Sequence, residues 1–462
     1  MKQLTLEQIA AAVGGSLDQA DPQAIATGAA ADSRLVAPGD LFVAIVGERV
    51  DGHDYAAAAF ESGAAAVLAQ RPVAGPAILV EDPVAALGAL ARYLLTLLPE
   101  LDVVGVTGSS GKTSTKDLLA AVFASRGPVV APAGSFNSEV GLPLTVLRCD
   151  DTTRTLVLEM GARGIGHIDY LCGIAHPKVG VVLNVGSAHV GEFGSRDAIA
   201  TAKGELPANL SATGVAVLNA DDPRVARMTT PGTTFTYGFA AAADVRIENL
   251  DLDERIRPIF DLVHGEDRAR VRLRVAGEHQ ASNAAAAATA GLALGMSLAE
   301  VSSQLEQAEI VSRWRMEVND STAGITVIND AYNANPESMT AALKALAEFG
   351  RNRPGNTTWA VLGEMLELGD STTDDHDRIG RLAVRLHVHR LIAVGEGARA
   401  IHLGAAHEGS WDGESVWLPD AAAAAEVLAA EARSGDVVLI KASRAVGLER
   451  VAEALLPEEV DS

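Results

Sequence analysis

The stretch 102–119, DVVGVTGSSGKTSTKDLL, carries the strongest structural signal in the chain and raises one question. An apolar strand leads into a loop of glycine and serine, which is followed by Gly-Lys-Thr and a helix. Phosphate-binding loops usually have Gly, four residues of any type, then Gly-Lys-Ser/Thr. Here Val106 stands where the first glycine should be, with Gly105 and Gly108 on either side. The stretch is therefore either a nucleotide site of a variant kind or a glycine-rich turn.

The order of the elements favours the nucleotide site. Backbone N–H groups of such a loop and of the helix start face an anion. Lys112 can reach terminal phosphates, and Thr113 can ligate magnesium. The alternative is a chance turn, because glycine and serine are common in loops. That alternative would require the order strand, loop, Gly-Lys-Thr and helix to arise by accident. The predicted phosphate-binding residues are Gly108, Ser109, Ser110, Gly111, Lys112, Thr113 and Ser114.

Length and charge limit the class of protein. A chain of 462 residues is too long for one ordinary core and suggests about three domains. Lys and Arg number 37 against 60 Asp and Glu, which gives a formal charge of -23. This acidity argues against non-specific binding to nucleic acid or to anionic membranes. It leaves room for a local basic pocket that binds a phosphorylated small molecule.

The cysteines and the N-terminus predict a cytoplasmic protein. Cys149 and Cys172 form no close-spaced pair, so neither a disulfide framework nor a zinc site is suggested. The start, MKQLTLEQIA, has no apolar core of signal-peptide length. The longest weakly polar run, NAAAAATAGLALGM, is too short and too small-sided to span a bilayer.

The chain divides into three predicted segments, 1–100, 101–312 and 313–462. The central one has apolar strands in TLVLEMG, KVGVVLNVG and GVAVLNADD, and the last has GITVINDA, TTWAVLGEM, RLIAVGEG and DVVLIKAS. Continuous apolar strands that alternate with helices indicate an α/β fold with buried, mainly parallel sheets. We expect the alanine-rich helices to pack at the surface.

Two residues at or near strand ends are candidates for phosphate or metal chemistry. Glu159 ends the strand TLVLEMG and could share magnesium with Thr113, although alone it would be a polar strand terminus. His189 follows the next strand, where a structural role and a metal or phosphate contact are equally plausible.

Lys203 lies in the middle of a predicted helix, where a lysine is normally solvated. If it points into the site instead, it could contact phosphate or form a carbamate with carbon dioxide. The carbamate needs a neutral amine, which costs about 4–5 kcal/mol at neutral pH from a reference pKa of about 10.4.

Two further polar clusters leave alternatives open. Asn283 opens a predicted helix after His279 and Gln280, and such clusters often only cap the helix. Arg315 and Asp330 lie near the start of the third segment, and Asp330 closes a strand in VINDAYNANPESM, so a ligand role is plausible for it. The same string also reads as a turn into a helix that starts at its proline.

Taken together, these strings resemble the Mur ligase family, ATP-dependent amide-forming enzymes of peptidoglycan synthesis. The family's loop has the form T-G-x-x-G-K-T/S, which residues 107–113 match throughout, so no glycine is needed at Val106. The resemblance covers nearly the whole chain. It implies an N-terminal domain for a uridine nucleotide, a central ATPase domain and a C-terminal Rossmann-like domain.

Within the family, NDAYNANPESM is similar to the members that add D-alanyl-D-alanine to UDP-N-acetylmuramoyl-tripeptide, while the DNPR box of the diaminopimelate-adding enzymes is absent. The string ADSRLVAPGDLFVAIVG resembles an N-terminal signature of the third and fourth ligases, which implies that Ser33 and Arg34 lie at the UDP end of the substrate. The implied partners are these two substrates, with no nucleic acid and no membrane, and we expect a monomer.

The resemblance also implies individual roles. ATP and two magnesium ions are the expected cofactors, with Thr113 and Glu159 on the first metal and His189 and a carbamoylated Lys203 on the second. Gln280 departs from the family, which often has His-Asn where this chain has His-Gln, so its longer side chain leaves that contact open. The remaining implied contacts are Asn137 near the phosphates and the sugar-nucleotide, Asn283 at the adenine, Arg315 and Asp330 at the nucleotide, and Asn333 and Asn335 at the substrate.

These residues imply that ATP phosphorylates the tripeptide's terminal carboxylate and that the amine of D-alanyl-D-alanine then displaces phosphate. Closure of the third domain would exclude water from the acyl phosphate. Two alternatives remain. A folylpolyglutamate synthetase-like ligase has a similar loop and lysine, although the YNANP and DSR strings argue against it. A nucleotide-dependent regulatory protein without ligase activity is the other.

Overall fold

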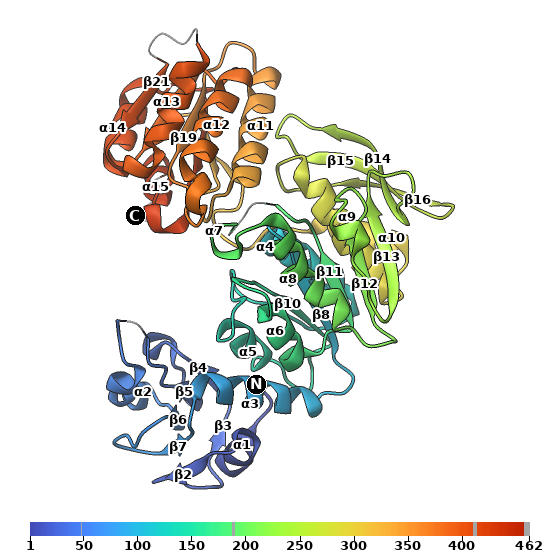
Figure 1. Cartoon of the computed structure of the whole chain (residues 1–462), viewed down its shortest axis with the longest axis vertical. Helices are drawn as coiled ribbons and strands as arrows, with labels where there is room; N and C mark the ends of the chain where they lie inside the picture. The colour runs from blue at the N-terminus through green and yellow to red at the C-terminus, as the bar shows by residue number, and fades with distance from the viewer. Residues whose placement is uncertain (48, 187–189, 410–413, 457–462) are drawn as a thin grey trace.

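The computed structural model describes residues 1–47, 49–186, 190–409 and 414–456. Three sheets follow one another along the chain, and each is built from strands of one predicted segment. In Figure 1 the N-terminal part lies at the bottom, the central part in the middle and the C-terminal part at the top. The α/β fold with mainly parallel sheets is confirmed, while the segment boundaries at residues 100 and 312 remain a prediction.

The N-terminal sheet has the order β2-β7-β6-β5-β4, in which only the β2–β7 pairing is antiparallel. Its strands are β2 (Ser16–Asp18), β4 (Gly28–Ala30), β5 (Asp40–Val43), β6 (Ala66–Ala69) and β7 (Ala77–Leu79). The short pair β1 (Leu4–Thr5) and β3 (Ile25–Ala26) and the helices α1 (Leu6–Val13) and α2 (Ala56–Glu61) lie beside it.

Helix α3 (Pro83–Thr96) joins this part to the central one. Asp82 caps it by accepting hydrogen bonds from the N–H groups of Val84 and Ala85, and proline fills the first helical position. Its buried leucines share one core cluster with α5 and α6 of the central part. The N-terminal part is therefore packed against the central sheet by a continuous apolar contact.

The central sheet has the order β16-β15-β14-β13-β12-β11-β8-β10-β9, with β8 between β10 and β11. Strands β9 to β14 run parallel, and β14, β15 and β16 form an antiparallel extension that the sequence did not predict. The strands are β8 (Asp102–Thr107), β9 (Val129–Val130), β10 (Thr155–Glu159), β11 (Val179–Val182), β12 (Val215–Asn219), β13 (Thr233–Gly238), β14 (Val245–Leu252), β15 (Pro258–His264) and β16 (Asp267–Arg272).

Helices cover both faces of this sheet. One core cluster holds α4 (Lys112–Phe123), α9 (His279–Ala293) and α10 (Leu298–Gln307). The other holds α5 (Gly141–Val146), α6 (His167–Ala175) and α8 (Arg196–Ala208), and the short α7 (Val190–Phe193) precedes α8. Alanine-rich α9 is buried along most of its length, so the expectation of a surface position was wrong for it. Its small side chains let the sheet, α4 and α10 approach closely.

The C-terminal sheet has the order β17-β18-β22-β19-β20-β21 and is parallel except for β17. Helices α11, α12 and α13 pack on one face, and α14 and α15 on the other, as in doubly wound folds. The strands are β17 (Glu317–Asp320), β18 (Thr326–Asn329), β19 (Thr358–Leu362), β20 (Arg390–Val394), β21 (Ser415–Leu418) and β22 (Val437–Lys441). The helices are α11 (Pro336–Asn352), α12 (Thr372–Arg385), α13 (Arg399–Glu408), α14 (Ala421–Glu431) and α15 (Glu449–Leu455).

Neither cysteine is paired, and burial raises the pKa of Cys149 and of Cys172 to about 12 each. In the part of the chain that the structure describes, every helix is too short or too polar to cross a membrane.

The turn between β14 and β15 ties the central sheet to the C-terminal part. Ile256 in this turn is fully buried in the core cluster of the C-terminal part, together with Met316 and Met339. Its φ of 54° is unusual for a β-branched residue, so the surroundings must hold it there. Next to it, Arg255 forms an ion pair with Asp320 of β17. This turn is a second connection between the two parts, besides the chain itself.

We predict that Ile256→Ala destabilises the C-terminal part by about 3 kcal/mol, because it leaves a cavity in a packed core. All four tryptophans lie within 313–462, so tryptophan fluorescence during urea unfolding reports on this part. Ile165→Ala is the matched control, because Ile165 is 61% exposed. Equal urea midpoints for the two variants would contradict the anchoring role.

Candidate active site

The loop after β8 is shaped by two glycines. Gly111 has a φ of 83°, and a Cβ there would lie 2.7 Å from the side-chain oxygen of Asn283. At Gly108 a Cβ would lie 2.9 Å from the Cβ of Leu183. Val106, in contrast, is a fully buried core residue inside β8. The loop begins only after this strand, which is why position 106 needs no glycine.

Lys112 and the backbone of the loop are the predicted phosphate-binding groups. The Nζ of Lys112 donates a 2.7 Å hydrogen bond to the carbonyl oxygen of Gly108. Burial lowers the pKa of Lys112, although the carboxylate of Glu159 partly opposes this. The N–H groups of Ser109 and Ser110 both donate to the side-chain oxygen of Asn184 at 3.0 Å.

Asn184 follows β11 and was missed from the sequence. Its amide nitrogen also donates to the carbonyl oxygen of Ser110 at 3.2 Å. The one side chain therefore binds both N–H and carbonyl groups of the loop. Only its position in LNV, directly after a strand beside β8, could have pointed to it.

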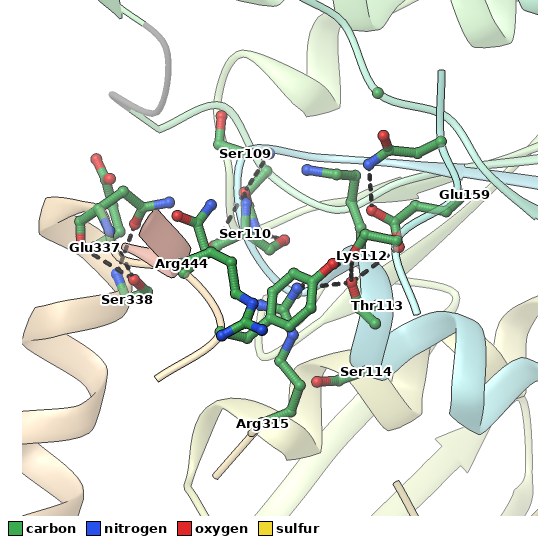
Figure 2. Close-up of a pocket in the computed structure, with 18 of the residues that line it drawn as sticks. Ser109, Ser110, Lys112, Thr113, Ser114, Glu159, Arg315, Glu337, Ser338 and Arg444 are labelled. Atoms are coloured by element: carbon green, nitrogen blue, oxygen red, sulfur yellow. Dashed lines mark hydrogen bonds between the residues drawn. The ribbon is translucent and has the colours of Figure 1, made fainter. Parts of the chain in front are cut away.

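Thr113 lies at the centre of a polar network. Its hydroxyl donates to the Oε2 of Glu159 at 2.9 Å and accepts from the Nη2 of Arg315 at 3.0 Å. The amide of Asn137 donates to the Oε1 of Glu159 at 2.7 Å, and the Ser135 hydroxyl lies 2.9 Å from that of Thr113. Figure 2 shows Arg315 reaching Thr113 from the side opposite Glu159. The carboxylate and hydroxyl oxygens have the chemistry that magnesium prefers.

Lys203 points into the protein and is not a solvated surface lysine. The residue is only 5% exposed, and burial, with a smaller contribution from Lys112, lowers its pKa well below the usual value. Neutral amine is therefore favoured at this position.

His189 lies outside the described residues, so its predicted contact stays a prediction. Among the residues whose positions are given, no group of three or more His, Cys, Asp or Glu side chains could hold a metal.

The helix start at α9 does not follow the capping alternative. The helix begins at His279, its N-cap is Glu278, and no side chain caps it. Asn283 is instead buried in the second turn, against the loop at Gly111, and its amide donates to the Oε1 of Gln280 at 2.9 Å. Gln280 therefore holds the side chain of Asn283 beside the loop.

The C-terminal part supplies the facing wall. Arg315 lies over the ring of Tyr332, with its guanidinium carbon 4.1 Å from the ring centre. The Oδ2 of Asp330 pairs with the Nζ of Lys441 at 2.6 Å, and Lys441 also donates to the carbonyl oxygen of Asn333 at 2.9 Å. Burial lowers the pKa of Lys441, and Asp330 opposes this.

Asn335 has the structural role that the sequence allowed as an alternative. Its side chain caps α11 by accepting from the N–H of Ser338 at 2.8 Å, and Pro336 fills the first helical position. The side-chain oxygen of Asn333 likewise accepts from the N–H of Ala334 at 2.9 Å. Both residues nevertheless line the cavity described next.

One cavity of about 630 Å³ brings these groups together. It opens between the loop and the C-terminal part, where Glu337, Ser338 and Arg444 face the loop (Figure 2). The predicted residues that line it are Ser109, Ser110, Gly111, Lys112, Thr113, Ser114, Asn137, Glu159, Lys203, Asn283, Arg315, Asp330, Asn333 and Asn335.

Ser33 and Arg34 do not line this cavity. They lie in a short 3-10 helix of the N-terminal part, Ser33–Leu35, whose N-cap is Asp32. Arg34 pairs with Asp32 at 2.6 Å and holds the pKa of that carboxyl at about 2.

The fold and the cavity define a protein with a phosphate-binding loop at the carboxyl edge of a parallel sheet, closed by a second α/β domain. Known families match the chain in three places. Residues 26–93 match the Mur ligase family catalytic domain, residues 106–291 the Mur ligase middle domain, and residues 314–444 the Mur ligase glutamate ligase domain. The chain belongs to the Mur ligase family.

Individual relatives are similar over their full length. The UDP-N-acetylmuramoyl-tripeptide--D-alanyl-D-alanine ligase of Mycobacterium tuberculosis is 48% identical over 505 residues, covering 99% of each chain. A crystal structure of MurF from Acinetobacter baumannii superposes with a TM-score of 0.88 at 31% identity, covering 98% of this chain and 99% of that one. The MurF ligase of Thermotoga maritima in complex with ADP gives 0.79 at 32% identity, covering 93% and 96%. The folylpolyglutamate synthetase-like and regulatory alternatives are not favoured.

We predict that Glu159→Gln lowers the rate of ADP formation about a hundredfold, because the charge that Thr113 and Asn137 position is lost while the side-chain shape is kept. Steady-state rates at several magnesium concentrations measure this. Glu266→Gln, in an exposed turn, is the control and should leave the rate unchanged. A Glu159→Gln enzyme with the normal rate would rule out a role in charge stabilisation.

Proposed function

We propose that the chain is an ATP-dependent ligase that joins D-alanyl-D-alanine to UDP-N-acetylmuramoyl-tripeptide and gives the UDP-N-acetylmuramoyl-pentapeptide. The observation that carries the proposal is one cavity lined by both the phosphate-binding loop and the YNANP segment. The full-length similarity to ligases named for this reaction supports the choice of substrates.

The reaction proceeds in two steps. The terminal carboxylate of the tripeptide attacks the γ-phosphorus of ATP, so that an acyl phosphate forms and ADP leaves. The free amine of D-alanyl-D-alanine then attacks the acyl carbon, loses a proton, and phosphate departs as the amide forms. Lys112, held at the loop by Gly108, stabilises the charge of the transferred group. The cavity walls from the C-terminal part keep water from the acyl phosphate.

Thr113 and Glu159 are the residues that would hold magnesium. Their oxygens lie 2.9 Å apart in a buried position, and magnesium commonly takes only one or two protein ligands besides phosphate and water. When bound, the metal neutralises charge on the phosphates. We assign a second metal to His189 and Lys203, as the resemblance implies.

A carbamate on Lys203 would supply the anionic ligand for that second metal. Carbon dioxide reacts only with the neutral amine, and the burial of Lys203 beside Lys112 favours this form. Carbamate formation would also turn a repulsion between two neighbouring lysines into an attraction. The lowered pKa of Lys203 is thus the support for this assignment.

The remaining assignments concern substrate binding. We place Asn283 at the adenine, where it lies beside the loop, and Asn137 near the phosphates and the sugar-nucleotide. Arg315 and Asp330 approach the nucleotide from the C-terminal part. Asn333 and Asn335, which line the same wall, are assigned to the D-alanyl-D-alanine end. We assign Ser33 and Arg34 to the uridine nucleotide, and we propose a cytoplasmic monomer.

Phosphate release tests the proposed function. It should require ATP, the UDP-tripeptide and D-alanyl-D-alanine together, because the acyl phosphate forms on one substrate and is consumed by the other. A coupled assay for phosphate, with each substrate omitted in turn, measures this dependence. Equal turnover with a single amino acid in place of D-alanyl-D-alanine would defeat the assignment.

For Lys203 we predict that Lys203→Ala loses most of its turnover and that small carboxylates such as formate or acetate partly restore it. A carboxylate that fills the gap replaces the carbamate oxygens as a ligand. Turnover of the unmodified protein should also fall as the pH drops through the lowered pKa of Lys203, because the protonated amine does not react with carbon dioxide. Normal turnover in Lys203→Ala would contradict the carbamate assignment.

Stability separates this loss from misfolding. Since the folded-state pKa of Lys203 lies below the unfolded value, the unfolded chain binds the extra proton between the two values, and burial costs stability there. Without nucleotide and bicarbonate at neutral pH, Lys203→Met should therefore have a Tm at or above that of the unmodified protein. Thermal unfolding followed by circular dichroism measures it.

A further inference from the structure

Helix α4 carries a buried ion pair one turn beyond the phosphate-binding residues. Lys116 and Asp117 follow Lys112 and Thr113 by four positions each, and both side chains are 1% exposed. The Nζ of Lys116 lies 2.5 Å from the Oδ1 of Asp117. Charged side chains this deep in a protein are rare unless they are paired.

The pair holds the chain segment that enters the C-terminal part. The Nζ of Lys116 donates to the Ser312 hydroxyl at 3.0 Å and to the carbonyl oxygen of Pro132 at 2.8 Å. The Oδ2 of Asp117 accepts from the backbone N–H of Ser312 at 3.1 Å. Both charges of the pair therefore contact one residue, 195 positions further along the chain than Asp117.

Beyond Ser312 the segment adopts an unusual backbone. Trp314 and Met316 have φ angles of 59° and 55°, in the left-handed region that residues other than glycine rarely adopt. Such conformations persist only where the surroundings hold them. Here the N–H of Trp314 donates to Glu317 at 2.8 Å, and that of Met316 donates to Asp330 at 3.2 Å.

Arg315 lies between these two strained residues. Its guanidinium reaches Thr113 at 3.0 Å and Ser135 at 3.2 Å, while its buried Nε has no hydrogen-bond partner among the described residues. Helix α4 therefore contacts this segment twice. Its second turn binds Ser312, and its first turn binds Arg315 through Thr113.

We propose that Lys116 and Asp117 are positioning residues, which fix Ser312 so that the strained segment 312–316 delivers Arg315 to the nucleotide site. One face of α4 then contacts the phosphates through Lys112 and Thr113, and the next turn holds the start of the C-terminal part. A shift of α4 on nucleotide binding would be passed directly to Arg315. The inference deepens the proposed function and rests on it for the identity of the reaction.

Stability alone does not account for the pair. Apolar side chains of similar volume in place of a buried ion pair often leave stability unchanged or raise it, whereas removing one partner leaves an uncompensated charge. The double variant Lys116→Met/Asp117→Leu therefore removes both contacts to Ser312 without leaving a buried charge. It is the first test of the positioning role.

We expect this double variant to fold with a somewhat lower Tm, because Ser312 and Pro132 lose hydrogen-bond partners, and to lose about a hundredfold in kcat/KM for ATP, as a misplaced catalytic group does. This loss in kcat/KM should act through Arg315. In an Arg315→Ala background the same double change should cause almost no further loss, because groups that act through one another are not additive. Lys178→Met, which removes an exposed lysine paired with Asp102, is the control and should change neither value.

Two results would overturn the proposal. One is an unchanged kcat/KM in the folded double variant, and the other is a loss that adds in full to that of Arg315→Ala. Ser312→Ala gives an independent test that leaves the interior of α4 intact, and it covers the case in which the double variant does not fold. It should lower kcat/KM severalfold, and the effect should vanish with Arg315→Ala; an unchanged value also overturns the proposal.

Direct binding separates this inference from the proposed function. The Kd for ATP, measured by titration calorimetry without the other substrates, should rise in the double variant and in Ser312→Ala. If the unmodified protein releases no phosphate with the UDP-tripeptide and D-alanyl-D-alanine, the proposed function fails. The Kd values still decide whether the pair acts on the nucleotide site.

Discussion

The hydroxyl of Thr113 is the point on which the arrangement of the site depends. It joins α4 to Glu159 at the end of β10 and to Arg315 of the C-terminal part, within 3.0 Å in both directions. Two neighbouring parallel strands bring these groups to one edge of the sheet, and the short glycine-rich loop places the helix between them. The carboxylate and the guanidinium carry opposite charges on either side of one neutral oxygen, so each stabilises the other.

The cavity brings several basic side chains together in an acidic protein. The formal charge of the chain is -23, yet Lys112, Lys203, Arg315 and Lys441 all line this space, together with carboxylates such as Glu159 and Asp330. Burial lowers the pKa of both Lys203 and Lys112; Lys112 adds a smaller lowering at Lys203, while at Lys112 the carboxylate of Glu159 opposes the shift and Arg315 adds to it. The phosphates of a bound nucleotide would interact favourably with these basic side chains. A ligand that binds only the folded state stabilises it by RT ln(1 + [L]/Kd), so the gain grows with the logarithm of the ligand concentration.

The sequence predicted the parts of this site that local chemistry determines. The strand 102–107, the loop and the helix start appear where they were expected, because alternating apolar strands and Gly-Lys-Thr have few other structural solutions. Helix α11 starts at its predicted proline for the same reason. Properties that arise from tertiary packing were not accessible. Three features depend on neighbours distant in sequence: the burial of Lys203, the hydrogen bonds between Asn184 and the loop, and the antiparallel β14–β16 extension.

The junction between the central and C-terminal parts also arises from tertiary packing and was not predicted from the sequence. Several contacts join them: Ile256 enters the C-terminal core from the β14–β15 turn, the ion pair on α4 holds Ser312, Arg315 reaches Thr113, and Arg196 pairs with Glu337. Residues other than glycine have positive φ near two of these contacts, at Ile256 itself and at Trp314 and Met316 beyond Ser312. Arg315 lies between the last two of these residues and reaches Thr113, so the strained segment and the nucleotide site meet at one side chain.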